Sequence, residues 1–165
     1  MKYLARLVLL AVVLVGGYFL WQALFPGPKR VIRHQLTKLA QLASYTAGEG
    51  DLAKMLAAER ISGFFADRVE LVLNIPGAES LQFDNRTELK QAVVQMRKTV
   101  RGFDAKFLDL DIEVTPGSQA AIVKLTLEAK AGRDSELIEQ ELQFNLKKVD
   151  GQWLIHRIQT VKTLR

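Results

Sequence analysis

The sequence of 165 residues contains no cysteine. This absence excludes disulfides, thiolate zinc sites, a cysteine nucleophile and the lipid-modified cysteine of lipoproteins, and it leaves the redox compartment open. The sequence also lacks internal repeats and low-complexity tracts. The length therefore fits one domain with a substantial core plus an appendage.

Acidic residues are absent before Glu49, whereas six basic residues precede it: Lys2, Arg6, Lys29, Arg30, Arg33 and Lys38. From Glu49 onward the 17 remaining basic residues face 18 acidic ones, so the formal net charge of +5 belongs to the N-terminal part. A nucleic-acid-binding domain carries its basic stripe on the folded part. We therefore expect no nucleic acid among the partners.

An uncharged apolar run covers residues 7–25, a span of 19 residues. As a helix it would be about 28 Å long, close to the ~30 Å hydrocarbon thickness of a bilayer. Aromatic residues near one end are typical of a membrane interface. We predict a transmembrane anchor with these representative residues: Leu7, Leu14, Tyr18, Trp21 and Phe25.

A cleaved signal peptide is the alternative for this segment, with Lys2 and Arg6 as its basic start. The run is long for a signal core, and no small-residue cleavage site precedes Pro26-Gly27-Pro28, so an uncleaved signal-anchor is favoured. We expect residues 1–28 to form the tail, anchor and linker, and residues 29–165 to form the domain.

The sequence gives two opposing indications for the side of the membrane on which the domain lies. The juxtamembrane basic residues Lys29, Arg30, Arg33 and Lys38 outnumber those before the span, which by the positive-inside rule favours a cytoplasmic domain. A short basic tail before the run is also typical of exported signal-anchors. We expect a single span in an inner or plasma membrane with the domain on the exported side, and the cytoplasmic alternative stays open.

Periodicity predicts the N-terminal elements of the domain. An amphipathic helix is expected over residues 30–45, a short helix over 52–60 and a further apolar turn over 61–65. A strand follows over 68–75, with a short partner around 81–83. Asn85 and Glu88 then form a capping-box-like start for another helix.

Two alternating segments near the C-terminus are joined at Asp150-Gly151, a strong signal for a two-residue β-hairpin turn. Pairing Val149 with Gln152 places one set of residues on one shared face of the sheet: Gln140, Leu142, Phe144, Trp153, Ile155, Arg157 and Gln159. The outer face would then carry Leu154, His156 and Ile158 near Ile122 of a preceding strand. A longer loop with a bulge would exchange the faces of the last strand.

On this outer face Lys124 is expected between Asp111 and Glu141. A lysine among carboxylates indicates cross-strand pairing on a solvated surface rather than a metal site. We therefore predict no metal and no cofactor.

The order of elements and three short motifs resemble the nuclear transport factor 2-like superfamily, which includes ketosteroid isomerases and SnoaL-type cyclases. The motifs are Gly50-Asp51-Leu52, Phe64-Phe65-Ala66-Asp67 and Asp150-Gly151-Gln152-Trp153-Leu154-Ile155. The resemblance implies an α+β fold in which a curved, mixed or antiparallel sheet wraps as a cone on three to four helices. It also implies a pocket in the mouth of the cone, with the face that holds Trp153 and Ile155 turned inward.

The resemblance to ketosteroid isomerases implies a carboxylate base near the end of the first strand, where this sequence has Leu73. General acid-base catalysis needs a titratable group near the substrate, and the expected inner face offers none, so we predict no catalytic residue. Two hypotheses follow. The first is a membrane-anchored, non-catalytic assembly domain that pairs with itself or a protein partner through Ile122, Leu154, His156 and Ile158. The alternative is a small-molecule pocket, binding or enzymatic, in which an inward Arg157 meets an anionic ligand.

Overall fold

The computed structural model describes residues 15, 27–72, 80–117, 119–132 and 136–161. Its helices are α2 (Pro28–Ala43), α3 (Asp51–Ser62) and α4 (Arg86–Thr99). Its strands are β1 (Phe65–Val72), β2 (Leu81–Phe83), β3 (Phe103–Val114), β4 (Ala120–Ala131), β5 (Ile138–Val149) and β6 (Gln152–Thr160). The described residues form an α+β fold, as predicted.

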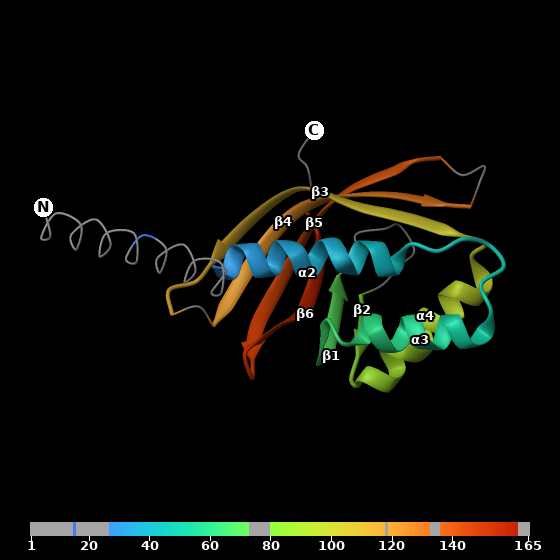
Figure 1. The fold of residues 1–165 in the computed structure, drawn as a ribbon, viewed down its shortest axis with the longest axis horizontal. Helices are drawn as coiled ribbons and strands as arrows, with labels where there is room; N and C mark the ends of the chain where they lie inside the picture. Colours follow the sequence, from blue (N-terminus) through green and yellow to red (C-terminus); the bar gives the residue numbers. More distant parts are fainter. Residues whose placement is uncertain (1–14, 16–26, 73–79, 118, 133–135, 162–165) are drawn as a thin grey trace, which may run out of the picture.

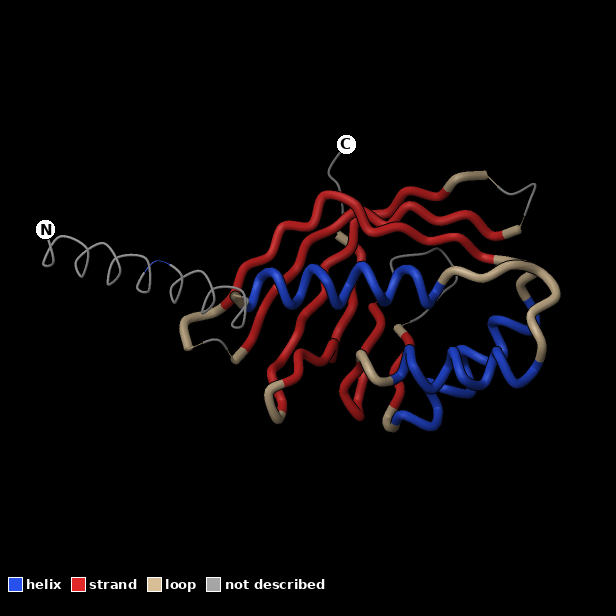
Figure 2. Tube along the Cα trace, viewed as in Figure 1, coloured by secondary structure: helices blue, strands red, loops and turns tan. Residues whose placement is uncertain are grey.

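The strands form one six-stranded sheet in the order β2-β1-β6-β5-β4-β3. Strands β1 and β6 are parallel, and every other neighbouring pair is antiparallel. The sheet curves around α2, which crosses its inner face, while α3 and α4 lie beyond the β1–β2 end (Figure 1). The secondary-structure view shows the same arrangement, with the long helix α2 across the sheet and the other two helices beyond one end of it (Figure 2).

The core lies between α2 and the concave face of the sheet. From α2 the buried residues Ile32, Leu36 and Leu39 enter one apolar cluster with Phe144 and Ile155 of the sheet. Their spacing along the sequence is the stripe expected of an amphipathic helix. Burial of this stripe is what fixes α2 inside the curved sheet.

Two local predictions near the helices have definite outcomes. The Asn85–Glu88 cap is confirmed, because the Asn85 Oδ1 atom accepts from the Glu88 backbone N–H at 3.0 Å. The apolar turn predicted over 61–65 is wrong at its end, since β1 already begins at Phe65. Phe65 pairs with Ile155 of β6, so sheet pairing overrides the local helical pattern there.

None of the helices in the described part of the chain is long and apolar enough to span a bilayer. The predicted anchor, residues 7–25, lies outside the described residues apart from Val15.

Candidate functional site

The β5–β6 hairpin forms with the predicted turn. Asp150 and Gly151 both have positive φ, at 49° and 82°, and Val149 pairs with Gln152. Since a type I′ turn needs positive φ at both central residues, the Asp-Gly prediction is confirmed. Trp153 and Ile155 lie on the inner face and are buried, at 3% and 0% exposure.

A β-bulge then changes the register that we expected. Leu146 pairs with Ile155, but the next residue, Asn145, pairs with Arg157, so His156 is an extra residue. An inserted residue turns every later side chain to the other face of the sheet. The predicted inner placement of Arg157 and Gln159 is therefore wrong, and Ile158 faces inward instead.

Beyond the bulge Ile158 pairs with Phe144 and packs against the core. Arg157 lies beside Glu70 of β1, with 3.4 Å between its Nη1 and the Glu70 Oε2 atom. An ion pair of this kind on a partly exposed face serves the β1–β6 contact. Arg157 is thus occupied on the outer face of the sheet.

The remaining predicted inner residues keep their face. Leu142 and Phe144 are buried in the core, at 6% and 2% exposure. Gln140 is half-buried, and its side-chain amide donates to the backbone carbonyl of Glu141 at 3.2 Å. The buried members of the set lie against other core side chains, so they serve packing at this place.

The four residues of the predicted interface do not share one exposed face in the structure. Ile122 lies on the outer face at 36% exposure, whereas Leu154 is 7% exposed and Ile158 points inward. His156 is half-buried at the bulge, and its burial, with Lys147 and Arg157 nearby, lowers the pKa of its imidazole. Two of the four residues are therefore not available on an outer surface.

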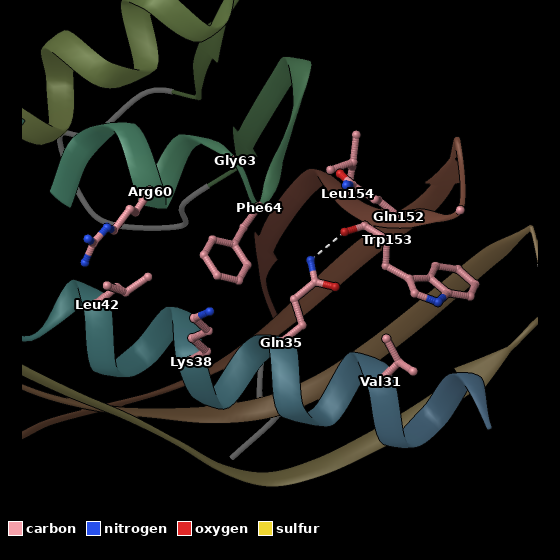
Figure 3. Close-up of a pocket in the computed structure, with 11 residues that line it drawn as sticks. Val31, Gln35, Lys38, Leu42, Arg60, Gly63, Phe64, Gln152, Trp153 and Leu154 are labelled. Atoms are coloured by element: carbon pink, nitrogen blue, oxygen red, sulfur yellow. Dashed lines mark hydrogen bonds between the residues drawn. The ribbon is translucent and has the colours of Figure 1, made fainter. Parts of the chain in front are cut away.

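A cleft of about 540 Å³ lies where α2, the end of α3 and the β5–β6 hairpin meet (Figure 3). We refer to it as the hairpin cleft, and its described lining consists of Val31, Gln35, Lys38, Leu42, Arg60, Gly63, Phe64, Gly151, Gln152, Trp153 and Leu154. This volume is within the range of small-molecule sites. Trp153 is the one residue that this described lining shares with the predicted pocket, so the hairpin cleft lies largely apart from that pocket.

The α2 wall of the hairpin cleft follows from helical spacing. Val31, Gln35, Lys38 and Leu42 recur at intervals of three and four residues, which places them on one stripe. This stripe borders the buried stripe of α2, so its side chains lie at the edge of the core rather than in open solvent. Figure 3 shows all four directed toward the α3 end and the hairpin.

The polar side chains of the hairpin cleft come from α2, α3 and the hairpin, which contributes Gln152. The Gln35 Nε2 atom donates to the Trp153 backbone carbonyl at 2.5 Å. This hydrogen bond links α2 to the start of β6. Lys38 and Arg60 are exposed and lie at the same end of the cleft (Figure 3). The described residues place no carboxylate within ion-pair distance of either cation. The cleft thus combines apolar walls with two free positive charges.

A second polar cluster joins α4 to the segment between α2 and α3. The Arg97 side chain, 1% exposed, approaches Glu49 at 2.6 Å, donates to the Leu42 carbonyl and lies 4.4 Å from the centre of the Tyr45 ring. Burial raises the pKa of the Tyr45 hydroxyl. These contacts engage both terminal nitrogens of the Arg97 side chain, so we interpret the cluster as structural.

The juxtamembrane basic residues do not act as one group. Lys29 and Arg30 are exposed, Arg33 donates from Nη2 to the Leu110 carbonyl at 3.2 Å, and Lys38 lines the hairpin cleft. Sequence reasoning placed Lys38 at the membrane surface and missed Gln35, Arg60 and Phe64. The stripe beside the buried face of α2 was the signal that could have indicated part of this set.

Over the described residues, no group of three or more histidine or acidic side chains is placed to hold a metal ion. Asp111 pairs with Lys124 across β3 and β4, as expected, but Lys124 meets Gln143 rather than Glu141 on β5. The absence of metal and cofactor stays a prediction.

Comparison with known proteins shows the fold. No family profile matches the sequence, and no curated protein does. A suggested scytalone dehydratase from Novosphingobium aromaticivorans superposes with a TM-score of 0.62 at 17% identity, covering 82% of this chain and 84% of that one. A nuclear transport factor 2-like protein with a cystatin-like fold from the same organism gives 0.60 at 12% identity, covering 80% and 79%.

A protein of unknown function with a cystatin-like fold from Nostoc punctiforme gives a TM-score of 0.61 at 14% identity, covering 82% of this chain and 91% of that one. These likenesses support the predicted nuclear transport factor 2-like fold. At such low identity they show the fold alone, and the activity of this chain has to come from its own site.

Proposed function

We propose that this chain is a membrane-tethered, non-catalytic domain of nuclear transport factor 2-like fold that binds a small molecule in the hairpin cleft. The observation that carries the proposal is the cleft of about 540 Å³, whose lining includes Gln35, Lys38 and Arg60 beside apolar side chains. A few polar groups placed in a mostly apolar concavity are the usual composition of a ligand site.

The chemistry of the described lining favours binding over catalysis. It offers two cations, Lys38 and Arg60, and the two amides of Gln35 and Gln152, and no carboxylate or imidazole. Arginine stays protonated in proteins, so Arg60 can hold an anion but cannot serve as a general base. We therefore assign the cleft to recognition. The names of the similar solved structures do not decide this point, because the same fold supports many activities.

The tether is the second part of the proposal. The apolar run over residues 7–25 is long enough for one span, and α2 begins three residues later at Pro28. A domain joined so closely to a bilayer would hold the hairpin cleft near the lipid surface. The exported side is the orientation that we propose for the domain.

A thermal-shift screen of the full chain in phosphatidylcholine nanodiscs tests the binding site. Val31→Trp should fill the cleft without disturbing the core, because Val31 is 38% exposed. We expect saturable stabilisation by a member of an alkyl carboxylate, phosphate and alcohol set, lost in Val31→Trp and kept in His34→Trp. His34 is exposed on α2 and does not line the cleft. Stabilisation that survives Val31→Trp would place the site elsewhere.

A second candidate is self-assembly, favoured by one specific observation. Leu52, Met55 and Leu56 form an apolar ridge on α3 with exposures of 71%, 63% and 50%. Exposed apolar patches mark interaction sites, and a second copy would offer the same ridge across a twofold axis. Sedimentation of the full chain should then show a dimer lost in Met55→Lys and kept in Gln41→Lys. A monomer in all variants would contradict assembly through this ridge.

A further inference from the structure

The hairpin cleft is polarised along its length. Figure 3 shows Lys38, Arg60 and Leu42 at one end and Val31, Trp153 and Gln152 at the other. Along α2 the step from Val31 to Lys38 is seven residues, about 10 Å at the rise of an α-helix. One end is thus cationic, and the opposite end is uncharged, with the aliphatic and aromatic side chains of Val31 and Trp153 beside the Gln152 amide.

The two cations come from separate elements. Lys38 belongs to α2, and Arg60 lies in the last turn of α3, where a positive charge also favours the helix dipole. A dipole contact alone would not require a second cation from another helix at the same end of the cleft. The nearby carboxylate of Glu59 is already engaged by Lys90 at 2.5 Å. Among the described residues no carboxylate pairs with either charge, so both can meet an anion in the cleft.

We propose that the hairpin cleft binds an amphiphile with an alkyl chain and an anionic head, a carboxylate or a phosphate; this inference rests on the proposed function. The head would lie between Lys38 and Arg60, because guanidinium and ammonium groups are the side chains that pair with such oxyanions. The alkyl chain would lie along Phe64 toward Val31 and Trp153. Contact with these walls removes apolar surface from water, which stabilises the complex.

Two sources could supply this chemistry: a free alkyl acid in the aqueous phase or an anionic lipid of the adjacent membrane. Val31 lies in the first turn of α2, which starts at Pro28 just after the apolar run. The apolar end of the cleft is therefore the end nearest to the predicted span. The head-group chemistry is the same for both sources, so the experiment separates them.

Trp153 provides a direct readout, because the chain has only two tryptophans and the other is Trp21. We would measure Trp153 fluorescence in the full-length Trp21→Phe variant, held in phosphatidylcholine nanodiscs, during titration with octyl phosphate and octanoate. Octanol and octyltrimethylammonium are the neutral and cationic counterparts. We expect saturable change with the two anions and at least about tenfold weaker binding of the other two.

Removal of the cations tests the placement of the head group. Lys38→Gln combined with Arg60→Gln should weaken octyl phosphate binding about tenfold, since the double variant removes two partly solvated ion pairs with the head group. Lys29→Gln combined with Arg30→Gln also removes two positive charges, from exposed positions of α2 outside the cleft, and should leave the affinity unchanged. Circular dichroism melts of every variant verify that the fold is retained.

The outcomes distinguish this inference from the proposed function. Equal affinity for octanol, or full affinity in the double variant, would overturn the anionic head group while leaving the cleft as a binding site. No saturable change with any alkyl compound would overturn both. A Trp153 change in nanodiscs doped with lysophosphatidic acid, without soluble ligand, would assign the lipid source, whereas a response to octanoate alone would assign the free acid.

Discussion

At the scale of single residues, Arg97 is a buried charged side chain that several contacts hold in place outside the hairpin cleft. Its charge is buried, and Glu49, the Leu42 carbonyl and the Tyr45 ring surround it. The sequence shows it only as one of several basic residues near the end of a helix, a pattern typical of dipole stabilisation. Its partners lie about 50 positions away in the sequence, which no local pattern reveals.

Arg97→Met should lower the free energy of unfolding by about 3 kcal/mol, because removal of one partner leaves Glu49 partly buried without its counter-charge. Urea unfolding of the full chain measures the change. The double variant Arg97→Met with Glu49→Gln should recover part of the loss, as expected for coupled neighbours. If the double variant lost as much stability as the two single variants added together, Arg97 and Glu49 would not be coupled, and the ion pair would not be the structural link.

His156 should make stability depend on pH. Burial and the nearby charges of Lys147 and Arg157 lower the pKa of its imidazole, and Glu70 opposes them. The unfolded chain, with the ordinary pKa of 6.5, then binds the proton more readily than the folded chain. Stability is therefore complete above about pH 6.5 and falls as the pH drops toward the lower folded pKa. Thermal melts across this range measure the effect.

The same pH series on His156→Gln should show a flatter dependence, since the variant has no titrating group at the bulge. His34→Gln serves as the control, because it removes the other histidine from an exposed position. An unchanged slope in His156→Gln would assign the pH dependence to another group.

At the scale of elements, the β5–β6 hairpin has one feature that the sequence predicted, its turn, and one that it did not, its bulge. The Asp-Gly turn was predictable, because few residues accept positive φ at both central positions. The bulge at His156 was not, since no glycine or proline marks it. Leu71 of β1 meets Ile158 across the parallel pair. Tertiary packing of these apolar residues offers the physical reason for the shifted register.

Two substitutions discriminate the observed register from the straight alternation that the sequence favours. Ile158→Ala should lower the free energy of unfolding by about 2 kcal/mol, because Ile158 packs against the core. Arg157→Ala should cost less than about 1 kcal/mol, the usual limit for a partly exposed ion pair. Denaturant unfolding measures both. A larger effect of Arg157→Ala than of Ile158→Ala would contradict the bulged register.

At the scale of the whole molecule, the order of helices and strands carried most of the information about the fold. Alternation and caps predicted the separate elements, and the resemblance predicted their arrangement as a curved sheet around α2. The hairpin cleft could not be predicted in the same way. Lys38, Arg60 and Trp153 are distant in sequence, and only tertiary packing brings them together.

Membrane orientation is the whole-molecule property that the proposal leaves for experiment. The absence of cysteine makes the orientation measurable, because one introduced thiol is then the only target for a maleimide. Glu113→Cys lies at an exposed position of β3. In a bacterial host with a permeabilised outer membrane, we expect an impermeant maleimide to label it in intact cells. Labelling only after lysis would place the domain in the cytoplasm.

The central claim is that the hairpin cleft holds the ligand of this domain, and a crystal structure of the chain with octyl phosphate tests it most directly. The account predicts density for the phosphate between Lys38 and Arg60, with the alkyl chain running along Phe64 toward Val31. Density in the concave face beside Phe144, or an empty cleft at a saturating concentration, would contradict the account.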